Sequence, residues 1–75
     1  MNMYNDLKEF DASKETVNFT CMFIHKTDRA VLIEYDGRKM WVPTVAVVDI
    51  QGAQKQQYTV QMEVQEWIAI EKEII

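Results

Sequence analysis

The sequence predicts a mainly β fold: a small five-stranded SH3-like or OB-like barrel with a short C-terminal helix and a short N-terminal helix or arm. Three observations support this prediction. Apolar and polar residues alternate through much of residues 16–65, Asp36-Gly37 marks a tight turn, and the chain has only 75 residues. Five short strands joined by tight turns are typical of a small barrel, and closure would remove the exposed edges of the sheet.

The N-terminal residues 1–15 form a predicted arm or short helix, and residues 16–75 form a single predicted domain. Tyr4, Leu7 and Phe10 recur every three positions, which is helical spacing. A helix of this length is marginal alone and needs to dock on the domain.

The first predicted strand begins at Thr16, where apolar residues start to alternate with polar ones. Its expected core face is Val17, Phe19, Cys21 and Phe23. Thr27-Asp28 is suitable for a turn, after which the segment AVLIEYD predicts a second strand.

Asp36-Gly37 is the strongest hairpin signal in the chain, because a type I′ turn needs positive φ at both central residues. The segment RKMWV is therefore expected to return antiparallel to the second strand. If Met40 and Val42 face inward, Lys39 and Trp41 face outward. Trp41 would then be a protein contact or would be covered by one of the terminal segments.

The remaining elements follow Pro43, which cannot donate to a strand ladder and should end the third strand or mark an edge. The segment TVAVVDI predicts a strand or a tight turn that leads into one. YTVQMEV alternates cleanly and predicts a fifth strand, whose apolar face is Tyr58, Val60, Met62 and Val64. The tail QEWIAIEKEII favours a short helix with Trp67, Ile70 and Ile74 on one face, and an extended strand is the alternative.

The overall charge is −4, with eight basic residues spread along the chain, which lowers the expectation of nucleic-acid binding. A single cysteine excludes an intrachain disulfide and fits a reducing cytoplasm. No apolar run is long enough to cross a membrane, and the N-terminus does not resemble a secretory signal.

Catalytic and metal-binding groups are scarce in this sequence. His25 and Cys21 have no partner at metal-ligand spacing, and the two glycines are too far apart for a phosphate-binding loop. We therefore expect no cofactor, no metal and no enzymatic activity, and we expect Cys21 to be a small buried hydrophobic residue.

Part of the sequence resembles small phage and prophage accessory proteins. The pattern is Thr-x-(Lys/Arg)-Ala, then a glycine turn, then Trp-apolar-Pro, then a closing Trp; it is matched here by Thr27, Arg29, Ala30, Gly37, Trp41, Val42, Pro43 and Trp67. The resemblance covers about two-thirds of the chain. It implies a phage origin and a bacterial host cytoplasm, with no functional residues to transfer.

Three functions are consistent with these features. The first is a protein-binding accessory module, in its narrower form an anti-CRISPR-like inhibitor of a bacterial defence system that binds a basic surface. Its candidate contacts are Trp41, Tyr35, Asp28, Glu34, Asp36, Asp49, Glu63 and Glu66.

The second function is single-strand nucleic-acid binding, in which aromatic side chains stack on bases and cations contact phosphates. Its candidate contacts are Lys26, Arg29, Arg38 and Lys39, with Tyr35 and Trp41 for stacking. The third is a homo-oligomeric structural protein, which would associate through Ile68, Ile74 and Ile75 near the C-terminus.

Overall fold

The computed structural model describes residues 15–75, and the predicted N-terminal helix or arm lies almost entirely outside them. Five antiparallel strands form one sheet in the order β3-β2-β1-β5-β4. The elements are β1 (Thr16–Lys26), β2 (Ala30–Tyr35), β3 (Arg38–Pro43), a 3-10 turn η1 (Thr44–Ala46), β4 (Val47–Gln51), β5 (Tyr58–Gln65) and a helix α2 (Glu66–Glu71). The predicted mainly β class and C-terminal helix are confirmed.

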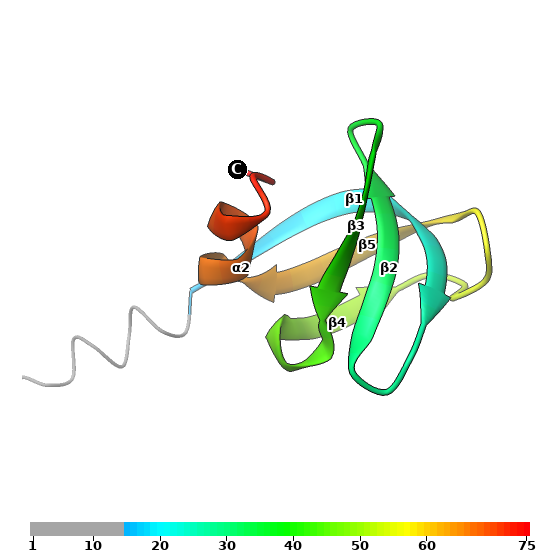
Figure 1. Cartoon of the computed structure of the whole chain (residues 1–75), viewed down its shortest axis with the longest axis horizontal. Helices are drawn as coiled ribbons and strands as arrows, with labels where there is room; N and C mark the ends of the chain where they lie inside the picture. Colours follow the sequence, from blue (N-terminus) through cyan, green and yellow to red (C-terminus); the bar gives the residue numbers. More distant parts are fainter. Residues whose placement is uncertain (1–14) are drawn as a thin grey trace, which may run out of the picture.

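The sheet is twisted, and η1 connects its two edge strands β3 and β4, with α2 at one end (Figure 1). No pairing joins β3 to β4 within residues 15–75, so closure of the predicted barrel is not seen there. The segment that follows Pro43 is the predicted tight turn leading into a strand. Thr44 still donates its N–H to the Arg29 carbonyl at 2.8 Å, which continues the β2–β3 register by one pair before the chain turns through η1.

The predicted hairpin between β2 and β3 is confirmed by the backbone angles. Asp36 has φ of 54° and Gly37 has φ of 78°, as a type I′ turn requires. The two strands then pair without interruption from Tyr35–Arg38 to Ala30–Pro43. The turn therefore fixes which side chains of β3 face the core.

The core lies on the inner face of the sheet and under α2. Alternate residues of β1, β2, β3 and β5 supply most of it: Phe19, Cys21, Phe23, Val31, Ile33, Val42, Val60, Met62 and Val64. The predicted inward positions of the first and fifth strands are largely confirmed. Tyr58 is the exception, since it lies at the start of β5 and is exposed.

The predicted apolar face of the C-terminal helix is wrong in part. Trp67 and Ile70 are exposed, whereas Ile68 and Ala69 are buried together with Ile74. The helix has only six residues, and the chain then turns back through Glu73, which has φ of 60°. This turn is a Schellman motif that brings Ile74 into the core, with Ile74 N–H donating to the Ala69 carbonyl at 2.8 Å.

The hairpin and the C-terminal segment are held together by polar contacts. Tyr35 Oη donates to the Ile74 carbonyl at 3.4 Å, and the Arg38 guanidinium donates to the carbonyls of Lys72 and Glu73. These residues are more than 30 positions apart, so the contact fixes the end of the chain to the β2–β3 hairpin. No helix within residues 15–75 is long and apolar enough to span a bilayer.

Candidate protein-binding surface

The outer face of the sheet, opposite the core, carries an apolar patch over β1, β2 and β3. We define the outer patch as Met22, Ile24, Leu32 and Trp41. Leu32 lies opposite Trp41 in the β2–β3 ladder and opposite His25 in the β1–β2 ladder. Side chains at paired positions share one face of a sheet, so Leu32 and Trp41 are neighbours on the outer surface.

The side chains of the outer patch do not contribute to the core. None of the four belongs to the core cluster or to the partly buried residues that pack against it. Trp41 is 45% exposed, and the other three are partly buried on the outer surface. The predicted outward orientation of Lys39 and Trp41 is therefore confirmed, and Trp41 is not covered by α2.

The sequence itself contains a signal for this patch. The segments CMFI and AVLI are apolar at both parities, so each strand has an apolar residue on both of its faces. In an antiparallel sheet with one solvated face, the outward positions are normally polar. Doubly apolar strands therefore indicate a second contact surface, and Met22, Ile24 and Leu32 were missed as candidates.

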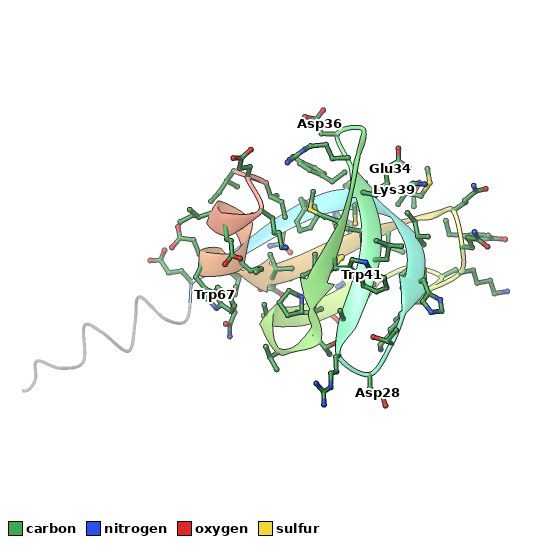
Figure 2. The ribbon with its side chains drawn as sticks, viewed as in Figure 1. Asp28, Glu34, Asp36, Lys39, Trp41 and Trp67 are labelled. Atoms are coloured by element: carbon green, nitrogen blue, oxygen red, sulfur yellow. The ribbon has the colours of Figure 1, made fainter. Side chains whose placement is uncertain are left out.

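A row of charged groups borders the outer patch on the hairpin side. Glu34 lies opposite Lys39 on β3 and opposite Met22 on β1. Figure 2 shows Glu34 and Lys39 together near the top of the hairpin, with Trp41 farther down the same strand. An apolar centre with charges at its border is the usual composition of a protein interface.

The carboxylates proposed as contacts do not form one surface. Asp28 and Asp36 lie at opposite ends of β2 (Figure 2). Asp49 and Glu63 lie opposite each other on β4 and β5, away from the outer patch, and Glu63 accepts a hydrogen bond from Thr16 Oγ1 at 2.6 Å. The structure therefore separates the predicted acidic contacts into groups with different surroundings, and Glu66 begins α2.

Two of the predicted contact residues have structural roles. Tyr35 is partly buried, and its ring meets Phe19 edge-to-face at a centroid distance of 5.2 Å. Arg38 is occupied by the C-terminal carbonyls and by Glu73, which lies 3.9 Å away. Both side chains therefore make contacts within the domain, and their predicted role in binding stays a prediction.

The remaining basic candidates lie in two places. Lys39 is on the outer face beside Trp41, whereas Lys26 and Arg29 flank the turn at the other end of β2. Lys26 pairs with Val31, an inward position, and lines a cavity of about 270 Å³ together with Thr44 and β4. The basic residues thus form no single stripe across the described surface.

Residues 15–75 include one cysteine, Cys21, and one histidine, His25. No three His, Cys, Asp or Glu side chains converge there as metal ligands. Burial raises the pKa of the Cys21 thiol to about 11, which disfavours the reactive thiolate and agrees with the predicted buried, inert role. The Thr44 hydroxyl beside the cavity is buried without a hydrogen-bond partner in this part of the chain.

Comparisons with known proteins add no functional assignment: no protein-family model, no curated protein and no solved structure matches the chain. The outer patch is therefore identified by its geometry alone.

Proposed function

We propose that the protein is a non-enzymatic binding module that docks another protein on the outer patch. The observation that supports this proposal is Trp41, 45% exposed, beside Leu32 on a sheet face that no described element covers. Tryptophan is among the residues most enriched at binding hot spots, where partly exposed aromatic rings become fully desolvated. The bordering Glu34 and Lys39 would fix the orientation of the partner.

The partner class is narrower if the sequence resemblance is taken into account. Small phage accessory proteins suggest a bacterial target, and we propose a component of a defence complex in the host cytoplasm. The separated carboxylates favour contact through the outer patch over occupation of a basic channel by an acidic face.

The architecture supports the finer fold type that the sequence predicts. We propose that the sheet is an open form of an SH3-like or OB-like barrel, because η1 links its two edge strands and the core fills its inner face. Small barrels of these types commonly bind ligands on the outside of the sheet or on its loops.

The test of protein binding compares three variants. Once a partner is isolated from host lysate by wild-type protein, its affinity is measured by titration against purified variants. Trp41→Ala should weaken binding by about 30-fold or more, because a hot-spot truncation costs about 2 kcal/mol or more. Leu32→Thr should also weaken binding, whereas Gln61→Ala, on β5 opposite Thr20 and away from the outer patch, should change it less than about threefold. Equal affinities for Trp41→Ala and wild type would contradict the proposal.

Single-strand nucleic-acid binding is the second candidate, because Lys39 and Trp41 lie two positions apart on the same exposed face. Glu34 opposite Lys39 opposes it by repelling phosphates. Titration with an oligonucleotide at low salt should quench Trp41 fluorescence if bases stack on it. Quenching that persists in Trp41→Phe would assign the signal to Trp67 and exclude this site.

A further inference from the structure

The two edges of the sheet differ in how well they are protected against pairing with another strand. On β4, the register is interrupted by a bulge between Val47 and Asp49, and Asp49 adds a charge. On β3, six consecutive residues pair regularly with β2, with no bulge. Both edges carry protective residues, with Arg38, Lys39 and Pro43 on β3, but only β4 is interrupted by a bulge, so β3 has the more regular edge of the two.

The free backbone groups of β3 follow from the hairpin. In a two-residue hairpin, the closing pair, here Tyr35 and Arg38, exchanges both hydrogen bonds, and bonded and non-bonded pairs then alternate. Lys39 and Trp41 therefore direct their N–H and C=O groups away from β2. Pro43 has the same parity but has no N–H to offer.

An antiparallel pair of two β3 strands can satisfy these groups in one register. If Met40 lies opposite Met40 of a second copy, each Lys39 lies opposite Trp41 of that copy, and about four backbone hydrogen bonds form. A register centred on Lys39 places two lysines opposite each other, which is unfavourable. A register centred on Trp41 places Lys39 opposite Pro43, which cannot donate.

We propose that β3 pairs with β3 of a second copy of this chain, in the two-fold register centred on Met40. A second copy is the expected partner because this register is self-complementary. The Lys39 cation of each copy lies opposite the exposed Trp41 ring of the other copy. A lysine ammonium over an indole ring is attractive. The pairing extends the sheet across two copies and joins their outer patches into one larger apolar surface.

This inference does not depend on the proposed function, because a monomer can still bind a partner through its outer patch. Failure of the dimer would leave that proposal unchanged. Loss of partner binding in Leu32→Thr, a position outside the β3 edge, would in turn leave the dimer unchanged.

The first test is sedimentation equilibrium of the full chain from about 10 μM to about 1 mM, a range that covers weak association. The mass should rise from monomer to dimer. Trp41→Lys should remain a monomer with an unchanged circular dichroism spectrum, because it places Lys39 opposite another lysine. Val45→Lys, at an exposed position outside β3, should dimerise as wild type does. A wild-type monomer at about 1 mM, or dimerisation of Trp41→Lys, would overturn the proposal.

The second test determines the register by disulfide trapping with oxidised glutathione, in chains that also carry Cys21→Val. Met40→Cys should link to itself, because opposed residues of antiparallel strands lie within disulfide range. Lys39→Cys and Trp41→Cys should link only when mixed, and this pair decides the outcome if Met40→Cys does not fold. Links of Lys39→Cys with itself, or mixed links no faster than those of Val45→Cys, would overturn the register.

Discussion

The outer face of one sheet has two halves of opposite character. Over β4, β5 and the first part of β1, most of its side chains are polar, and some bond to one another, as Gln61 does to Thr20 and Thr16 does to Glu63. Val48, in the β4 bulge, is an exposed apolar exception. Over β2, β3 and the second part of β1, the same face carries the outer patch. On β1, the change falls between Thr20 and Met22. Both halves cover the same core, so packing of the core does not require them to differ. Contact with water explains why one half is polar, whereas the apolar half needs another explanation.

The largest expected effect is the loss of stability caused by core substitutions, and it should be equal beneath the two halves. Ile33 lies under the apolar half and Met62 under the polar half, and both side chains are fully buried. The two substitutions to compare are Ile33→Ala and Met62→Ala. Each substitution leaves a cavity and should lower the free energy of unfolding by about 3 kcal/mol. Urea denaturation measures this change. A loss below about 1 kcal/mol for one of the two would show that the core does not extend equally under both halves.

Cys21 lies in the core beneath the boundary between the two halves and pairs with Val60. Titration of its thiol therefore reports on burial at this boundary. Burial raises its pKa to about 11 from 9.0, so the unfolded chain loses the thiol proton first as the pH rises. The unfolded state then binds fewer protons than the folded state, and the contribution of Cys21 to stability should fall between about pH 9 and pH 11.

The measurement is the difference in unfolding free energy between wild type and Cys21→Val at several pH values. This difference should be constant below pH 9 and shift against wild type above it. A disulfide reagent at pH 8 should also label native Cys21 at least about tenfold more slowly than the unfolded chain. Equal labelling rates would contradict the buried position.

Sequence reasoning recovered the inner face better than the outer one. Period-two alternation identified Phe19, Met62 and other inward positions, and Asp36-Gly37 identified the hairpin, because these signals are local. The hydrogen bonds from Arg38 to the Lys72 and Glu73 carbonyls join residues more than 30 positions apart, and no local pattern encodes them. The six-residue helix α2 is too short for its period to reveal which face is buried, so Trp67 was misplaced.

Replacement of apolar residues in the outer patch by polar ones should change the apolar character of the surface more than it changes the stability of the fold. The double variant Met22→Thr and Leu32→Thr keeps strand-compatible outer positions and should change the unfolding free energy by less than about 1 kcal/mol. It should reduce binding of an apolar fluorescent dye, because the outer patch is the main apolar area on this face. Gln61→Leu, a control on the polar half, should not reduce dye binding. Unchanged dye binding in the double variant would place the apolar surface elsewhere, for example at Trp67 and Ile70.

The smallest expected effect on stability comes from the repulsion between two carboxylates on the polar half. Asp49 and Glu63 lie directly opposite each other on β4 and β5, and like charges at opposed positions destabilise a sheet. Asp49→Asn should therefore raise the unfolding free energy by about 0.2–1 kcal/mol at low salt, and the gain should shrink in about 1 M salt, where exposed charges are screened. On the apolar half, Glu34 and Lys39 are opposite in sign, so the matched change Glu34→Gln should lower stability slightly. If both substitutions changed stability in the same direction, net charge rather than pairing across each half would determine it.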